Sequence, residues 1–241
     1  MELKKLSSRI YYLPNEEETD RPVLGYINGD KYSLAVDAGN SRRHVEKFYE
    51  ELRNENLRLP DYTVITHWHW DHTFGMHAVS GKTVSGRRTN EKLKEVAAWQ
   101  WTDEATKARL DTGKDIELCD RCIKLEYPDR NDIKVITSDI EFSGTLKLDL
   151  GGIYCEITEV RAPHSEDSVL IFVPDERTVF VGDADCEDHY NNHGRYDKAE
   201  LERYIELIKD YNFNTYVIGH DKPESREEVL DYLDGELEKI K

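Results

Sequence analysis

The feature that most constrains this chain is a run of ten residues ending at Gly75, which reads Thr-His-Trp-His-Trp-Asp-His-Thr-Phe-Gly. It holds three histidines and a carboxylate within six positions, directly after a short apolar segment that is typical of a buried strand. Because alternate residues of an extended chain point the same way, His67 and His69 can reach one point in space. Asp71 and His72 follow where the chain turns and can reach a second point nearby. The alternative is a polar surface loop, but the spacing suits two metal ions held side by side.

The rest of the chain alternates strand-like and helix-like segments. Turn residues at Asn28-Gly29-Asp30 predict a hairpin, and Asp197 has the character of a helix N-cap. Strands are expected at residues 9–13, 23–28, 32–37, 61–66, 133–137, 145–150, 154–160, 168–173, 178–181 and 215–218, and helices at residues 41–54, from 197 and at 225–239. We expect one α/β domain over residues 1–241, with a helical insertion at about residues 85–131 that covers a site.

The composition of the chain limits the classes of molecule that it is expected to bind. The chain has 241 residues, with 33 Lys and Arg against 50 Asp and Glu, and a formal net charge of −17. This acidity predicts no nucleic acid and no membrane as partner, and favours a small-molecule substrate. The opening residues, MELKKLSSRIYYLP, lack the apolar core of a signal peptide, and four cysteines are too few for a disulfide framework. We therefore expect a cytoplasmic protein, and the oligomeric state stays open.

The histidine run resembles the H-x-H-x-D-H signature of the metallo-β-lactamase superfamily, and further landmarks of that family follow in order. They are an aspartate after an early strand, a histidine after a later strand, a strand ending in Gly-Asp and a last strand ending in Gly-His, which correspond to Asp37, His164, Asp183 and His220. The resemblance implies an α/β (α+β) fold, a four-layer αβ/βα sandwich of two mixed β-sheets with outer helices. The site would lie at one edge of this sandwich, with Asp37 bracing the metal loop.

The resemblance also implies a ligand set for two divalent metal ions. Zinc is the preferred metal, with iron and manganese as alternatives. His67, His69 and His164 would hold the first ion, and Asp71, His72 and His220 the second, with Asp183 bridging both and Asp185 as its rival. Two such ions can share a water and lower its pKa, which gives a bridging hydroxide as nucleophile. The two ions outweigh the two aspartates and the hydroxide, so the site would carry a slight positive charge, which favours an anionic or polarised acyl or phosphoryl group. Asp71 would orient the hydroxide and pass a proton to the leaving group.

These features predict a metal-dependent hydrolase that cleaves an ester, thioester, lactone or phosphoester bond in a small molecule. Tyr190 follows the bridging aspartate closely enough to be a candidate catalytic donor to a developing oxyanion. The alternative is a mononuclear-iron dioxygenase of the same fold, which keeps the same signature, whereas a non-catalytic binding protein would have lost ligands that this chain retains. Cys119 and Cys122 form a single CxxC pair, whose role stays open because a structural zinc needs two more ligands.

Overall fold

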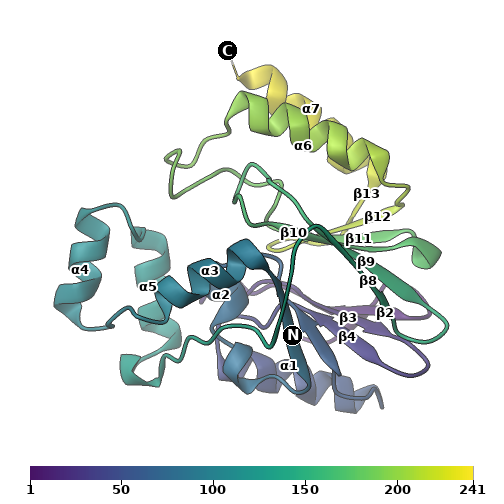
Figure 1. Ribbon diagram of the computed structural model, residues 1–241, viewed down its shortest axis with the longest axis horizontal. Coiled ribbons are helices and arrows are strands. Elements are labelled where there is room, and N and C mark those ends of the chain that lie inside the picture. The colour runs from purple at the N-terminus through teal and green to yellow at the C-terminus, as the bar shows by residue number, and fades with distance from the viewer. Residues whose placement is uncertain (241) are drawn as a thin grey trace.

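The computed structural model describes residues 1–240, and its strands form two mixed sheets (Figure 1). The first sheet runs in the order β1 (Lys4–Lys5), β2 (Ile10–Leu13), β3 (Leu24–Asn28), β4 (Ser33–Val36), β5 (Tyr62–Val64), β6 (Lys82–Gly86) and β7 (Ile140–Phe142). Its neighbours pair antiparallel from β1 to β4 and parallel from β4 to β7.

The second sheet is mostly antiparallel. It runs in the order β13 (Glu224–Ser225), β12 (Thr215–Ile218), β11 (Thr178–Gly182), β10 (Val169–Val173), β9 (Tyr154–Glu159) and β8 (Thr145–Asp149). Only β11 and β12 pair parallel. The apolar core lies between the two sheets, where Ile27, Val64 and Val84 of the first pack with Ile157 and Ile171 of the second. All five residues of β10 are buried because this strand is covered on both faces.

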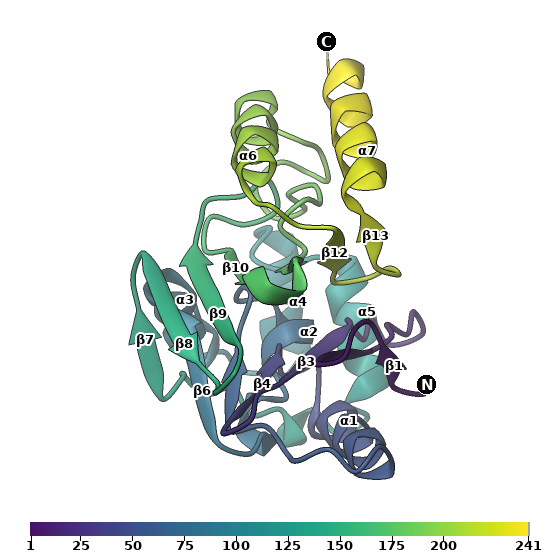
Figure 2. The same cartoon turned by 90° about the vertical axis from the view of Figure 1, so that its right-hand side faces the viewer.

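Helices cover the two outer faces, which gives four layers (Figures 1 and 2). Helix α1 (Arg42–Asn54) packs Phe48 and Leu52 on the first sheet, and α6 (Lys198–Asp210) and α7 (Arg226–Lys239) pack Tyr204 and Leu233 on the second. The predicted sandwich of two mixed sheets with outer helices is therefore confirmed. Within residues 1–240, no helix has both the length and the apolar composition that a membrane span requires.

Side-chain caps fix where the outer helices begin. The Asp197 carboxylate accepts a hydrogen bond from the Glu200 amide at the start of α6, as the sequence predicts. At the start of α7, Ser225 and Glu228 form a reciprocal capping box, which satisfies two amides that the helix itself cannot pair. The predicted hairpin at residues 28–30 also forms, since β3 and β4 pair antiparallel across it.

One predicted strand is wrong. Residues 133–137 form no strand, and β7 lies a few residues later at the edge of the first sheet. Val135 and Ile136 instead pack against the neighbouring helices, so this apolar run serves burial without sheet pairing. The backbone amides that follow it, of Ser138 and Asp139, donate to side chains, those of Asn90 and of Thr83 in β6, rather than to the backbone of a neighbouring strand.

The stretch predicted as a helical insertion carries three helices beside the sandwich (Figure 1). They are α3 (Arg87–Val96), α4 (Asp103–Asp111) and α5 (Glu117–Glu126), while short helical turns elsewhere are α2 (Trp70–Thr73), η1 (Met76–Ala78), η2 (Arg130–Asp132) and η3 (Pro174–Glu176). An aromatic cluster joins the insertion to α2, with Trp70 and Phe74 packed against Val96 and Ile123. That the whole chain is one domain stays a prediction.

Candidate metal centre

The predicted ligands converge at the ends of strands from both sheets. The histidine run follows β5, His164 follows β9, Asp183 follows β11 and His220 follows β12. Six of these seven side chains are buried, and the seventh, His220, is about one-third exposed (32%). Two groups of donor atoms result, within each of which the atoms lie no more than 4.8 Å apart: His67, His69 and His164, and Asp71, His72, Asp183 and His220.

In the first group, three imidazole nitrogens face one another. Nδ1 of His69 lies 3.0 Å from Nε2 of His67 and 2.9 Å from Nε2 of His164. His164 donates the proton on its Nδ1 to the carbonyl oxygen of Glu187 at 2.8 Å. Its Nε2 therefore carries a lone pair that is directed into the group. Burial lowers the pKa of His67 and His69, so these rings are neutral. Because Nδ1 of His69 carries one proton or one lone pair, it cannot pair fully with both neighbours.

In the second group, histidines alternate with carboxylates. Oδ2 of Asp71 lies 3.0 Å from Nε2 of His72 and 3.0 Å from Nε2 of His220. Burial alone would lower the pKa of His72, but Asp71, Asp183 and Asp37 outweigh burial and raise that pKa. The same carboxylate–imidazole contacts overcome the effect of burial on Asp71 and hold the pKa of its carboxyl below the ordinary value. The group therefore keeps its carboxylates ionised, as metal ligands must be.

Asp37 braces the histidine run from behind. Its Oδ2 lies 2.8 Å from Nδ1 of His72, and Oδ1 accepts from the backbone amide of Thr66 at 2.7 Å. The hydroxyl of Thr66 also contacts Asp37, at 2.9 Å, and lies 3.1 Å from Nδ1 of His67. This arrangement directs Nε2 of His72 and of His67 into the two groups. The sequence prediction omitted Thr66, although its place directly before His67 at the strand end was an available signal.

Asp183 belongs to the second group and also faces the first. Its Oδ2 is 3.3 Å from Nε2 of His72 and 3.7 Å from Nε2 of His164, so one oxygen faces a histidine of each group. Its other oxygen, Oδ1, is buried without a hydrogen-bond partner. A glycine makes room for this carboxylate, because a Cβ atom at Gly219 would stand 1.9 Å from Oδ1. The rival Asp185 belongs to neither group within residues 1–240, and burial raises the pKa of its carboxyl to about 7.

This donor set fits divalent metal ions. Imidazole nitrogens fixed by partners on their far side, together with ionised carboxylates, are the ligands that zinc and similar ions take in proteins. Oδ1 of Asp183 is buried without a hydrogen-bond partner, and Nδ1 of His69 cannot pair with both of its neighbours. A cation would supply the missing partner for both atoms. The arrangement of both groups therefore supports binding of divalent metal.

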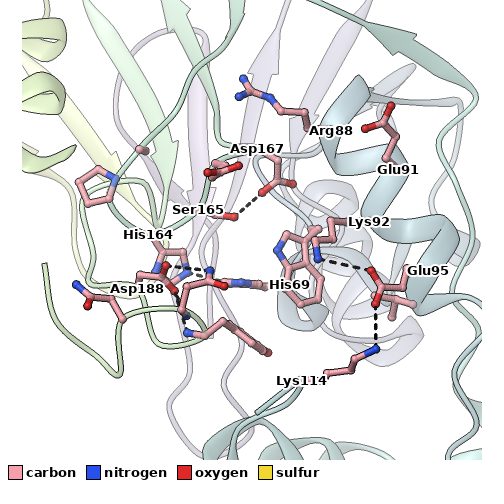
Figure 3. Close-up of a pocket in the computed structure, with 18 of the residues that line it drawn as sticks. His69, Arg88, Glu91, Lys92, Glu95, Lys114, His164, Ser165, Asp167 and Asp188 are labelled. Atoms are coloured by element: carbon pink, nitrogen blue, oxygen red, sulfur yellow. Dashed lines mark hydrogen bonds and ion pairs between the residues drawn. The ribbon is translucent and has the colours of Figure 1, made fainter. Parts of the chain in front are cut away.

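The first group opens into a cleft of about 930 Å³ (Figure 3). His69 and His164 line it, together with Lys92 and Glu95 of α3. Glu95 offsets the positive charge of two lysines in this cleft, because it pairs with Lys92 at 3.6 Å and with Lys114 at 3.9 Å. The remaining lining combines aromatic side chains with two loops, and it includes Trp68, Trp99, Tyr190, Ser165, Asp167 and Asp188.

Tyr190 lines the cleft, but its hydroxyl is engaged elsewhere. Its ring centroid lies 4.8 Å from that of His69 and 5.1 Å from that of Trp68. The hydroxyl donates to the thiol sulfur of Cys119 at 3.5 Å, so a role as oxyanion donor would require this contact to break. Burial raises the pKa of the Cys119 and Cys122 thiols, which makes them poor nucleophiles. The catalytic role of Tyr190 stays a prediction.

Comparisons with known proteins agree with this geometry. The sequence matches the family described as the metallo-beta-lactamase superfamily over residues 23–224, whereas no curated protein matches it significantly. The structure of the DIM-1 metallo-beta-lactamase is similar, with a TM-score of 0.67 and 18% identity, covering 100% of this chain and 99% of that chain. A metallo-beta-lactamase from Pontibacter korlensis gives a TM-score of 0.63 and 16% identity, with 99% of each chain covered.

A sec-alkylsulfatase, Pisa1 from Pseudomonas sp., has a TM-score of 0.72 and 13% identity, covering 98% of this chain and 41% of that chain. The chain thus spans about two fifths of the sulfatase. At these identities the likeness to solved structures shows the fold alone.

Proposed function

Because the chain belongs to the metallo-beta-lactamase superfamily, we propose that it is a metal-dependent hydrolase that uses two divalent ions, with zinc preferred. His67, His69 and His164 would hold one ion, and Asp71, His72 and His220 the other, with Asp183 shared. The observation that carries this proposal is the position of Asp183, whose Oδ2 faces His72 at 3.3 Å and His164 at 3.7 Å. A carboxylate that faces both groups can be shared by a pair of neighbouring ions.

Divalent ions bound there would supply Lewis acidity and would lower the pKa of water towards neutrality. The residues of the chain would do the positioning. Asp71 stays ionised because His72 and His220 hold its pKa down, so its carboxylate is an acceptor that can orient an attacking water. We also propose that Asp71 accepts a proton from this water and passes it to the leaving group.

The cleft supports a small-molecule substrate whose reacting group reaches His69 and His164. A cavity of about 930 Å³ is of the size that holds a drug-sized ligand. Trp68 and Trp99 offer apolar surface for the body of such a molecule, beside the ligands His69 and His164. We propose an ester, thioester, lactone or phosphoester as the bond cleaved, with an anionic or polarised group at the reacting end.

A reducing compartment is also proposed. All four cysteines carry free thiols, and three of them are buried. Free buried thiols are typical of proteins that stay in a reducing environment. The cytoplasm is accordingly the compartment we propose.

Hydrolysis by protein in defined metal states tests the proposal. The full chain would be stripped with chelator, reloaded with zinc or iron, and offered matched esters, thioesters, lactones and phosphodiesters. We expect no cleavage without metal, cleavage of at least one class with zinc, and loss of that cleavage in His164→Ala. The matched control is His77→Ala, whose ring hydrogen-bonds the Phe74 carbonyl at 2.9 Å and belongs to neither donor group among residues 1–240.

Two results would contradict the hydrolase. Cleavage that persists unchanged after metal is removed would remove the metal from the mechanism. Protein that retains a single iron, hydrolyses nothing and consumes oxygen would instead support the iron dioxygenase.

A further inference from the structure

A loop near the N-terminus, residues 15–21, contacts His220, and Asp20 of this loop faces the ring nitrogen that does not face Asp71. The side-chain amide of Asn15 donates to the carbonyl oxygen of His220 at 2.8 Å. Oδ1 of Asp20 lies 3.7 Å from Nδ1 of His220, close enough for the charge of the carboxylate to act on the ring. The backbone amide of Val23 donates to the carbonyl of Gly219 at 2.6 Å, which holds the end of this loop beside the same turn. The loop therefore contacts both the backbone and the ring of His220.

The His220 ring lies between carboxylates. Its Nε2 is 3.0 Å from Asp71, and its Nδ1 faces Asp20. For Nε2 to act as a metal ligand it must present a lone pair, and a neutral ring then carries its proton on Nδ1. A carboxylate on the Nδ1 side stabilises that proton, orients the ring and raises the basicity of Nε2. Asp20 is about one-quarter exposed (25%), so its charge is only partly screened by water.

The loop is anchored at both ends of the turn that presents Asp20. Asp20 itself has a left-handed backbone, with φ of 58°, a conformation that Asp and Asn tolerate better than most residues. Before it, the carbonyl of Thr19 accepts from the side chain of Asn40 at 2.7 Å. After it, Nη2 of Arg21 donates to both carboxylate oxygens of the buried Glu126 at 3.1 Å each. Since Glu126 is the last residue of α5, the helical insertion helps to hold this loop in place.

From these contacts we propose that Asp20 is a positioning residue that fixes the tautomer and direction of His220 for the second metal ion. The inference rests on the proposed function, because it requires an ion in the group of Asp71, His72 and His220. Asp20 lies just before the range over which the family matches, residues 23–224, so family membership assigns it no role. The metal centre thereby extends from the strand ends to a loop outside that range.

Zinc titration of the metal-free full chain tests this, with a chelating dye as competitor and ¹⁵N NMR of the histidine rings to show which ring binds. Asp20→Asn keeps an oxygen and tolerates the left-handed backbone but removes the charge, and Asp20→Ala removes both. The matched control is Glu17→Gln, which removes a charge from an exposed side chain of the same loop. Thermal unfolding without metal shows whether each variant remains folded.

We expect zinc affinity at the His220 group to fall about tenfold in Asp20→Asn and about 100-fold in Asp20→Ala, the range that outer partners of ligands span. Affinity at the His67, His69 and His164 group should be unchanged, as should both affinities in Glu17→Gln. At limiting zinc, the His220 ring should then remain unbound while the His69 ring is bound.

Three results would overturn the inference. They are unchanged affinities in both Asp20 variants, equal losses at the two groups, and an equal loss in Glu17→Gln. A wild-type chain that binds no zinc through His220 would overturn the proposed function as well, which distinguishes the two failures.

Discussion

The close approach of Gly219 to Asp183 makes a sharp prediction about metal binding. In Gly219→Ala, the new Cβ atom would stand 1.9 Å from Oδ1 of Asp183 and 3.3 Å from a ring carbon of His72. Real Cβ atoms essentially never come within 3.0 Å of such a neighbour, so the carboxylate must retreat by about 1.1 Å. Ligand distances in metal sites vary by only about 0.2 Å, so a displacement of this size removes Asp183 from any ion it holds.

The magnitude follows from what ligand partners contribute. Loss of an outer partner typically costs 10- to 100-fold in metal affinity, and loss of a ligand exceeds that range. We therefore expect zinc affinity to fall by about 100-fold or more, equivalent to about 2.8 kcal/mol. Because Asp183 faces both groups, both ions should be weakened, unlike the selective loss expected for Asp20→Asn.

The assay is competition for zinc between the metal-free protein and a chelating dye, with thermal unfolding measured in parallel. Gly235→Ala is the matched control, since that glycine lies within α7 and a Cβ there meets no atom within 4 Å. It should bind zinc as the wild type does and gain up to about 1 kcal/mol of stability from helix propensity. Wild-type zinc affinity in a folded Gly219→Ala protein would refute the assignment of Asp183 as a shared ligand.

Three further predictions use other residues. Asp37→Asn removes the charge behind His72 while tolerating the left-handed backbone at that position (φ of 66°), and should weaken zinc binding at the His72 group about 10- to 100-fold by dye competition. Tyr190→Phe should lower kcat far less than the roughly 100-fold that loss of an oxyanion donor causes, because the hydroxyl is engaged by Cys119; a loss of that size would restore the catalytic role. Burial raises the pKa of Asp115 to about 6, so its contribution to stability is greatest when it is protonated and is lost as pH rises from about 4 through 6. Asp115→Asn does not titrate, so denaturant unfolding should show its stability rising relative to wild type over that window by up to about 3 kcal/mol, and a constant difference would contradict this.

The parts of the fold and site that sequence could predict are those set by local pattern. The histidine run places four proposed ligands within six positions, because the alternation of an extended strand and the turn after it are local geometry. The strand β10 reads as a continuous apolar run and is buried on both faces, and the N-cap at Asp197 begins α6 as expected. The more distant proposed ligands His164 and Asp183 could be placed only through the family resemblance, since nothing local joins them to the run.

The parts that sequence could not predict depend on tertiary contacts. Residues 133–137 have the composition of a strand, but composition cannot distinguish sheet pairing from burial against helices. The tautomer of His164 is fixed by the backbone carbonyl of Glu187, which any residue type would supply. Asp20 and His220 are 200 positions apart, and neither residue type nor spacing signals their contact.

The central claim is that two neighbouring metal ions share Asp183. Anomalous diffraction at the zinc absorption edge, from crystals of the zinc-loaded protein, tests it most directly. We predict two zinc peaks per chain, one bonded by His67, His69 and His164 and one by Asp71, His72 and His220, with the Asp183 carboxylate contacting both. A single peak, or peaks bonded by other residues, would contradict the two-ion account.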